Sequence, residues 1–259
     1  MKSWALLLEY DGTPYVGWQR QGSGISVQSV LEAACARLHG GAPVPAVAAG
    51  RTDAGVHAAG QVVLVALPDR YRPEQMRAAL NFHLKPHPIV VLQAAAAATG
   101  WSPRFDATGR AYAYRILNRR ARPALALHRA WHVERHLDAA AMAEAAALLL
   151  GTHDFTSFRA SACQAKSPVR TLDRLDVARD GDTLTITAEA RSFLHHQVRN
   201  IVGTLKLVGE GRWRPEQVLA ALEARDRRAA GPTAPPDGLT LVAVRYPQDP
   251  FDASRQVSL

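Results

Sequence analysis

In the first hundred residues, segments whose hydrophobic positions follow the period of a strand alternate with segments whose hydrophobic positions follow the period of a helix. A strand is expected at residues 4–10, and further strands at 44–49, 61–67 and 89–93. Ser26 is suited to cap a helix whose apolar residues recur at helical spacing: Val27, Val30, Leu31, Ala34 and Leu38. Pro73 is expected to open a second helix that runs to about Leu84. The predicted order is therefore βαββαβ.

The rest of the chain repeats this order less regularly. Asp138 is expected to cap a helix ending at Gly151, and a hairpin is expected to turn at Asp180 and Gly181. The remaining elements are expected as strands at 111–117, 170–178, 183–190 and 239–245, and as helices at 193–208 and 215–225.

This element order predicts an α+β protein. The simplest arrangement is two tandem ferredoxin-like units, each βαββαβ with an antiparallel sheet, that form a central cleft. The halves share no evident sequence identity, so the repeat is inferred from element order alone. Turn-forming residues at 101–109 favour a boundary there, with an N-terminal domain at 1–105 and a C-terminal domain at 106–259.

The charge balance favours a polyanionic partner. Lysine and arginine number 31 against 23 acidic residues, which gives a net charge of +8 and a pI near 10.0. Such a field attracts nucleic acid, although an arginine-rich surface without that function would give the same numbers. The net charge alone therefore does not establish nucleic-acid binding, and a sequence motif is needed as well.

The cysteines and the hydrophobic runs narrow the cellular setting. Cys35 and Cys163 lie far apart and belong to no CxxC or Cys/His cluster, so a structural zinc site is not expected. No hydrophobic run is long enough to cross a bilayer, and no signal peptide is evident. We expect a soluble, cytoplasmic protein without a membrane partner.

The segment GRTDAGVHA, residues 50–58, is the strongest candidate for chemistry. It brings the carboxylate of Asp53 together with the guanidinium of Arg51 and the imidazole of His57, in a turn of small residues between two expected strands. Glycines at 50 and 55 permit unusual backbone conformations and a close approach by a ligand.

These nine residues resemble the signature loop of the TruA-type tRNA pseudouridine synthases. Three further segments are similar to the same family: YDGTPYVGWQRQ at 10–21, RAYAYRI at 110–116 and FLHHQVRNIVGTL at 193–205. GTHDFTSFR at 151–159 is also similar, so the resemblance extends from about residue 6 to 246. Trp101, Ser102 and Pro103 depart from the Phe, His and Ala that commonly precede Arg104 in relatives.

The resemblance implies a role for several side chains. Asp53 corresponds to the invariant aspartate, as nucleophile or as acid and base; Arg199 corresponds to the arginine that pairs with it and keeps it ionised. Tyr112 corresponds to the tyrosine that packs on the target uracil, whereas Tyr114 is expected to pack in the core. Arg51 is expected to hold a phosphate or to fill the space of the flipped nucleotide; a structural role in the loop is the alternative.

Helical spacing adds an expectation about the third segment. On one helix, His195 and Arg199 lie four residues apart and share a face. His195 and His196 would then diverge by about 100°, which makes a poor chelating pair, so no metal is expected.

The implied reaction isomerises uridine to pseudouridine at positions 38, 39 and 40 of the tRNA anticodon stem-loop, by a homodimer. No dinucleotide or phosphate-binding glycine motif is present, which agrees with a reaction that needs no cofactor. Further tRNA contacts are expected from Arg20, Arg104, Phe105, Arg110, Lys166, Arg170 and His195. Two alternatives remain: a non-catalytic RNA-binding or RNA-chaperone protein of the same fold, and an RNA N-glycosidase that releases uracil.

Overall fold

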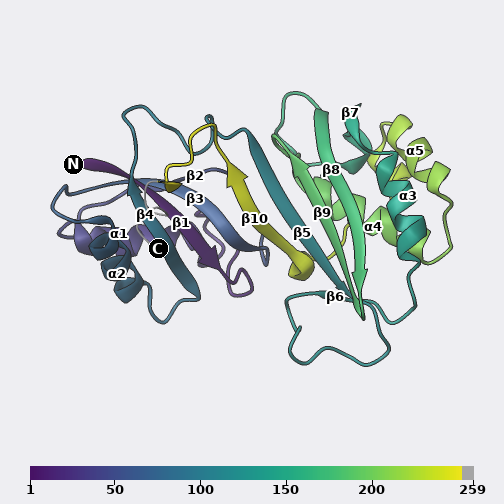
Figure 1. Cartoon of the computed structure of the whole chain (residues 1–259), viewed down its shortest axis with the longest axis horizontal. Coiled ribbons are helices and arrows are strands. Elements are labelled where there is room, and N and C mark those ends of the chain that lie inside the picture. Colours follow the sequence, from purple (N-terminus) through teal and green to yellow (C-terminus); the bar gives the residue numbers. More distant parts are fainter. Residues whose placement is uncertain (253–259) are drawn as a thin grey trace. The chain divides into compact units, whose positions relative to one another are not determined.

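The computed structural model describes residues 1–252 as a mixed α/β protein whose strands are mostly antiparallel (Figure 1). The chain divides into two compact units, Met1–Thr108 together with the chain from Leu241 onward, and Gly109–Thr240. The expected boundary at residues 105 and 106 lies close to this division, but most of the last strand, expected in the second domain, groups with the first unit. Residues 253–259 of the expected second domain lie outside the described residues.

The first unit has the expected βαββαβ order. Its elements are β1 (Lys2–Tyr10), α1 (Val27–Leu38), β2 (Val47–Ala48), β3 (His57–Leu67), α2 (Pro73–Leu84) and β4 (Ile89–Ala96). β1 lies in the middle and pairs antiparallel with both β3 and β4, while β2 pairs antiparallel with β3. The final strand, β10 (Leu239–Arg245), lies next to β3 on its other side.

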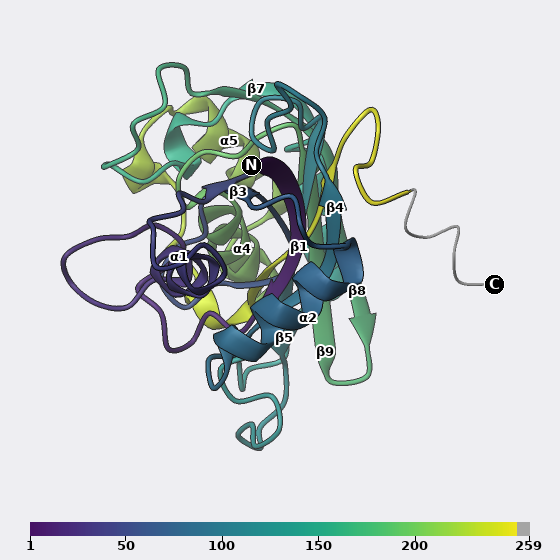
Figure 2. The ribbon, with the colours of Figure 1, turned by 90° about the vertical axis from the view of Figure 1, so that its left-hand side faces the viewer.

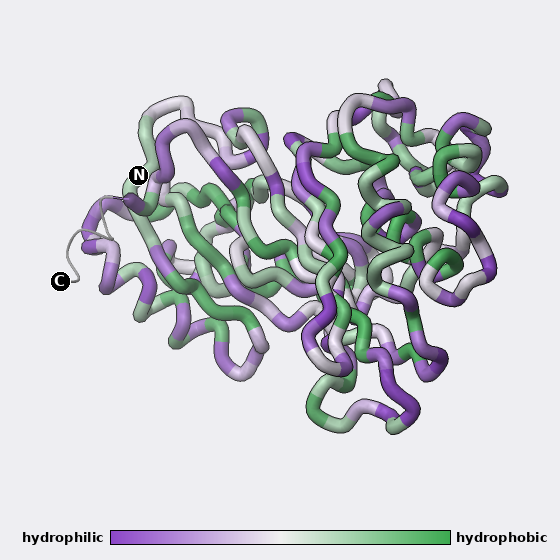
Figure 3. The backbone as a smooth tube through the Cα atoms, turned by 45° about the vertical axis from the view of Figure 1, so that its right-hand side comes forward, coloured by the Kyte–Doolittle hydropathy of each residue, from purple (hydrophilic) through white to green (hydrophobic). Residues whose placement is uncertain are grey.

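Local signals in the sequence explain both helices of this unit. The Ser26 side chain accepts from the Ser29 N–H and the Ser29 hydroxyl oxygen accepts from the Ser26 N–H, which together form a capping box for α1. Pro73 occupies the first turn of α2 as expected. α2 packs against β4 and α1 packs against α2 (Figure 2). Hydrophobic residues follow the strands, with Trp4, Leu6 and Leu8 fully buried on β1 (Figure 3).

The second unit contains an antiparallel sheet in the order β5-β9-β8-β7, with β6 parallel to β5. Its strands are β5 (Gly109–Leu117), β6 (Trp131–His132), β7 (Gly151–Asp154), β8 (Val169–Asp180) and β9 (Thr183–Ala190). Its helices are α3 (Ala139–Ala147), α4 (Gln197–Gly209) and α5 (Pro215–Glu223), with short 3-10 turns η1 (Thr156–Phe158), η2 (Arg227–Ala229) and η3 (Pro236–Gly238). α3 packs against β8, α4 and α5.

Several expected boundaries are wrong, for local reasons. β2 is only two residues long, and β4 continues to Ala96. α3 ends at Ala147, and Gly151, which has a φ of +93°, begins β7, a strand that the sequence did not predict. α5 ends at Glu223, two residues before Arg225 takes a left-handed φ of +48°.

Two further corrections concern the second unit. The hairpin pairs Asp180 with Thr183, so its turn residues are Gly181 and Asp182 rather than Asp180 and Gly181. α4 begins at Gln197, four residues later than expected. Within residues 1–252, no helix combines the length and the hydrophobicity needed to span a bilayer.

Candidate active site

The signature loop joins β2 to β3 as expected, and its side chains alternate between solvent and protein. Arg51 is exposed, Thr52 is buried, and Asp53 is half-buried. The Val56 N–H donates to the Asp53 carbonyl at 3.1 Å, which closes a tight turn directly after the aspartate. Gly55 has the positive φ, +76°, that this turn requires, whereas Gly50 does not have a positive φ and has open space where a Cβ would lie.

A buried hydroxyl pair anchors the loop one residue before Asp53. The Tyr10 hydroxyl, at the end of β1, lies 2.8 Å from the Thr52 Oγ1, and both side chains are buried. Burial raises the pKa of Tyr10 to about 12, although hydrogen bonds to Thr52 and Gln61 lower it in part. The phenol therefore stays neutral at physiological pH and remains able to bond to Thr52. Sequence reasoning missed this pair, since its members are 42 residues apart.

The segment after β1 closes around the loop from a second side. The Trp18 N–H donates to the Thr52 carbonyl at 3.0 Å, and the Gly12 N–H donates to His57 Nδ1 at 3.1 Å. Because Nδ1 accepts this bond, a neutral His57 carries its proton on Nε2. Asp11 Oδ1, which also accepts from the Thr13 hydroxyl and N–H, lies equally close to Nδ1, and the two groups form an ion pair only when His57 is protonated.

Two glycines of the 10–18 segment allow this close approach. A Cβ on Gly12 would lie 2.0 Å from the Val56 carbonyl oxygen, and one on Gly17 would lie 2.8 Å from the Thr52 carbonyl oxygen. Gly17 also has a φ of +108°. Asp53 therefore lies on a backbone that is fixed from both ends by the YDGTPYVGW segment.

In the second unit, the two tyrosines of β5 have different surroundings. Tyr114 is fully buried, its hydroxyl donates to the Pro235 carbonyl at 2.8 Å, and burial raises its pKa. It is a core residue, as expected. Tyr112 is half-buried, and its ring meets that of Phe193 edge to face at 5.3 Å and 89°. Tyr112 is therefore the one of the pair whose ring remains partly accessible.

Arg199 lies in the first turn of α4 and is tied to the segment before η3. Its Nε donates to the Ala234 carbonyl at 2.8 Å, and its own carbonyl accepts from the Ala234 N–H at 3.1 Å. These two bonds hold the half-buried side chain at its base.

A buried amide beside Arg199 fixes this helix turn, and sequence reasoning missed it. The Asn200 Nδ2 donates to the Phe158 carbonyl at 2.8 Å, while its Oδ1 accepts from the Thr233 hydroxyl at 2.6 Å and from Arg227 at 3.2 Å. Gly203, one turn later, admits no side chain, since a Cβ would lie 1.7 Å from the Pro232 carbonyl oxygen. A polar residue within the apolar stripe of α4 was the signal available in the sequence.

The late start of α4 corrects the expectation for His195. His196 has a left-handed φ of +62°, and the Gln197 side chain accepts from the Leu194 N–H, so residues 193–196 form a turn and not a helix. His195 and Arg199 therefore do not share a helical face. The expected divergence of His195 and His196 is also wrong, because the centres of their rings lie 4.1 Å apart.

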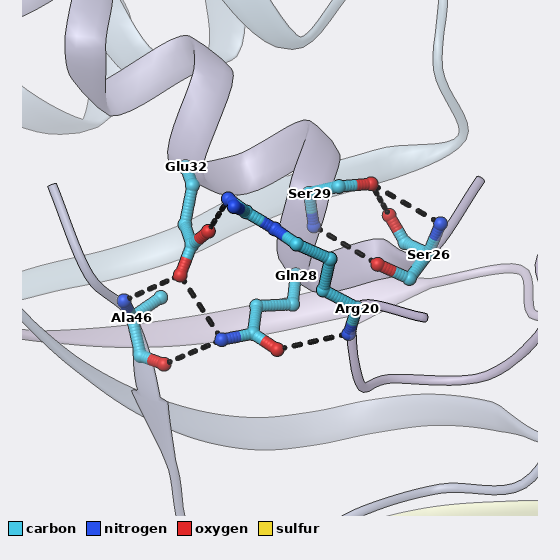
Figure 4. A network of polar contacts seen from close by, with 6 residues as sticks. All are labelled: Arg20, Ser26, Gln28, Ser29, Glu32 and Ala46. Atoms are coloured by element: carbon cyan, nitrogen blue, oxygen red, sulfur yellow. Dashed lines mark hydrogen bonds and ion pairs between the residues drawn. The ribbon is translucent and has the colours of Figure 1, made fainter. Parts of the chain in front are cut away.

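Among the expected tRNA contacts, Arg20 already has a structural partner. Its guanidinium forms an ion pair with Glu32, which also accepts from the Ala46 N–H and the Gln28 amide at 3.0 Å each (Figure 4). The Arg20 side chain is still 65% exposed. It can therefore meet a phosphate while it anchors the 10–21 segment to α1.

The other expected contacts divide into tethered and exposed side chains. Arg110 donates to the Arg191 carbonyl at 2.6 Å, and Arg170 donates to carbonyls of its own loop. Lys166 and His195 are exposed. Phe105 is 74% exposed, and the Arg104 guanidinium lies 5.4 Å from the centre of its ring. An aromatic ring so exposed is suited to stacking on a base.

Comparisons with known proteins agree with the resemblance seen in the sequence. A family described as tRNA pseudouridine synthase matches residues 7–106 and 145–247. The chain is 69% identical over 252 residues to tRNA pseudouridine synthase A of Acidiphilium cryptum, covering 97% of this chain and 99% of the relative. It is 60% identical over 246 residues to the protein of that name from Paramagnetospirillum magneticum (95% and 96% covered), and 54% identical over 256 residues to that from Gluconobacter oxydans (98% and 93%). The chain therefore belongs to the tRNA pseudouridine synthase family, whose members are isomerases.

Proposed function

We propose that this protein isomerises uridine to pseudouridine at positions 38, 39 and 40 of the tRNA anticodon stem-loop, with Asp53 as the reacting carboxylate. The observation that carries the proposal is the presentation of Asp53. A half-buried acid is held on a backbone fixed by Tyr10, Gly12 and Trp18, in a chain that belongs to this family. A protein that only bound RNA would gain nothing from a rigidly held acid, because the carboxylate repels phosphates.

The reaction breaks the bond between ribose C1′ and uracil N1, turns the base, and forms a bond from C1′ to C5; C5 then loses its proton and N1 gains one, either directly or through solvent. No group leaves the RNA and no electrons are transferred overall. Asp53 acts as nucleophile at C1′ or C6, or as the base of an elimination. A second carboxylate to activate water, as in a glycosidase, would instead divert the intermediate to hydrolysis.

Three further side chains complete the proposed site. Arg199 is proposed to pair with the Asp53 carboxylate, and its tether to Ala234 restricts where its guanidinium can point. Tyr112 covers the target uracil, its ring orientation limited by the edge of Phe193. Arg51, exposed two residues before Asp53, takes the place of the flipped nucleotide or holds its phosphate.

The wider assembly is proposed from the same resemblance. Two ferredoxin-like domains, divided near residues 105 and 106 and with most of β10 in the first, are proposed to form a cleft together, and two copies are proposed to share one tRNA in the cytoplasm. The element order of the first unit, βαββαβ, supports this interpretation. Further tRNA contacts are proposed for Arg20, Arg104, Phe105, Arg110, Lys166, Arg170 and His195.

Pseudouridine mapping on tRNA incubated with the protein tests the proposal. We expect new pseudouridine at positions 38, 39 and 40, and no change in RNA mass before a pseudouridine-specific label is added. Release of free uracil would favour the N-glycosidase, and binding without modification would favour an RNA chaperone. Pseudouridine found only outside the anticodon arm would contradict the proposed substrate site but not the enzyme class.

A further inference from the structure

A concave, arginine-lined surface lies in the second unit, outside the residues assigned to catalysis. We call it the arginine hollow. It measures ≈ 410 Å³. One wall is formed by η1 and the residues that follow it, and the other by residues 225–228, which follow α5 and continue into η2. Four arginines contribute to its wall: Arg159, Arg225, Arg227 and Arg228.

Hydrogen bonds fix the two walls of the hollow to each other. The Asp226 N–H donates to the buried hydroxyl of Ser157 at 2.9 Å, which joins the segment after α5 to η1. Asp226 then accepts from the Arg228 N–H and caps η2. Arg227 donates to Asn200 and Thr233 at 3.2 and 3.1 Å, so one arginine of the hollow also bonds to the buried amide beside Arg199.

The charges in and under the hollow do not balance. Two carboxylates face the four guanidinium groups: Asp226, bonded to Arg228 at 2.7 Å, and Asp154, which lies 3.7 Å from Arg225. Although burial alone would raise it, the pKa of Asp154 is lowered by hydrogen bonds from Thr156 and by the charges of Arg225 and Arg159. With both acids ionised, the cluster keeps an excess of two positive charges.

The arginines also keep donors to spare. A guanidinium carries five N–H donors in a planar fork that matches the oxygens of a phosphate. Arg225 is 71% exposed and its contact with Asp154 is longer than a hydrogen bond, and Arg159 lies half-buried on the opposite wall. A group with several anionic oxygens would therefore find donors from both walls.

We propose that the arginine hollow binds a backbone phosphate of the tRNA substrate. The inference rests on the proposed function for the identity of the RNA, and it adds a contact outside the proposed catalytic residues. This phosphate contact contributes to the affinity for tRNA and to the position of the tRNA on the protein. It does not contribute to the chemical step, because the hollow contains none of the residues proposed to act on the uridine.

Arg159→Gln and Arg225→Gln test the proposal, with Arg212→Gln as the matched control. Arg212 is 64% exposed in the same unit, lies outside the hollow, and its loss changes the net charge equally. Each hollow variant is expected to bind tRNA about tenfold more weakly at constant salt, and to reduce the slope of log affinity against log salt by about 1. The rate at saturating tRNA should stay at the wild-type value, and thermal unfolding verifies that the variants are folded.

Two comparisons make the outcome decisive. Affinities and salt slopes equal to those of Arg212→Gln overturn the proposal, as does tight binding of inorganic phosphate by calorimetry with unchanged tRNA affinity. A defect seen with whole tRNA and with an isolated anticodon stem-loop supports a phosphate within that arm; a defect confined to whole tRNA supports one elsewhere. If the wild-type protein binds tRNA through the hollow but forms no pseudouridine, the proposed function fails and this inference stands.

Discussion

Replacement of Gly12 by alanine should slow pseudouridine formation while leaving the affinity for tRNA nearly unchanged. The added Cβ would lie 2.0 Å from the carbonyl oxygen and 2.5 Å from the carbonyl carbon of Val56, and both atoms belong to the backbone, so neither can rotate away. Ordinary contact begins at 3.4 Å. The backbone three residues after Asp53 would therefore move by more than about 1 Å, a displacement that can cost a factor of about 10² in rate. Overpacking should also lower the free energy of unfolding by about 1–3 kcal/mol.

Single-turnover pseudouridine formation with excess enzyme isolates this effect, and tRNA affinity is measured in parallel. Gly22→Ala is the matched control, because Gly22 lies in the same segment between β1 and α1 and its added Cβ would have no heavy atom within 4 Å. We expect a slow Gly12→Ala variant with near wild-type affinity, and a control with wild-type rate and stability. A Gly12→Ala variant as fast and as stable as the control would refute the reasoning.

Three further predictions concern stability, measured by urea unfolding. Tyr10→Phe leaves the buried Thr52 hydroxyl without its partner and should cost about 1–3 kcal/mol; an unchanged midpoint would mean that the pair contributes nothing. Asn200→Ala leaves the Phe158 carbonyl without its hydrogen-bond donor and should lower the free energy of unfolding by about 3 kcal/mol. If Asn200 positions Arg199, the single-turnover rate should fall as well. Burial raises the pKa of Tyr10 from 10.0 to about 12 and also raises the pKa of Tyr114. Above pH 10 the unfolded chain therefore releases protons that the folded protein retains, so the free energy of unfolding should fall between pH 10 and 12. A free energy of unfolding that does not change over this range would contradict the prediction.

The fold could be predicted where its signals are local. Ser26 and Pro73 mark the starts of α1 and α2 by side-chain chemistry within one helical turn, and both starts are confirmed. The start of α4 depends on the left-handed backbone of His196, and β7 is identified by its pairing with β8, which lies beyond an intervening loop. A hydrophobic pattern shows neither a left-handed backbone conformation nor the pairing of two strands.

The same distinction applies to the site. Asp53 and Tyr112 stand out because they fall within short motifs, and Tyr114 was expected in the core on the same evidence. The bond from Tyr10 to Thr52 and the amide of Asn200 connect segments that are far apart along the chain. Residues that hold a site in place are therefore harder to find from one sequence than residues that carry its chemistry.

The exchange of Asp53 for asparagine tests the central claim most directly. Asparagine keeps the size of the side chain and removes its charge, and Asp69→Asn, at a 64% exposed side chain in the same unit, removes a charge elsewhere. With tRNA in single-turnover assays, we predict that Asp53→Asn forms no pseudouridine yet binds tRNA at least as tightly as wild type, since one repulsive charge is gone. Asp69→Asn should behave as wild type. Pseudouridine formation by Asp53→Asn at the wild-type rate would contradict the account.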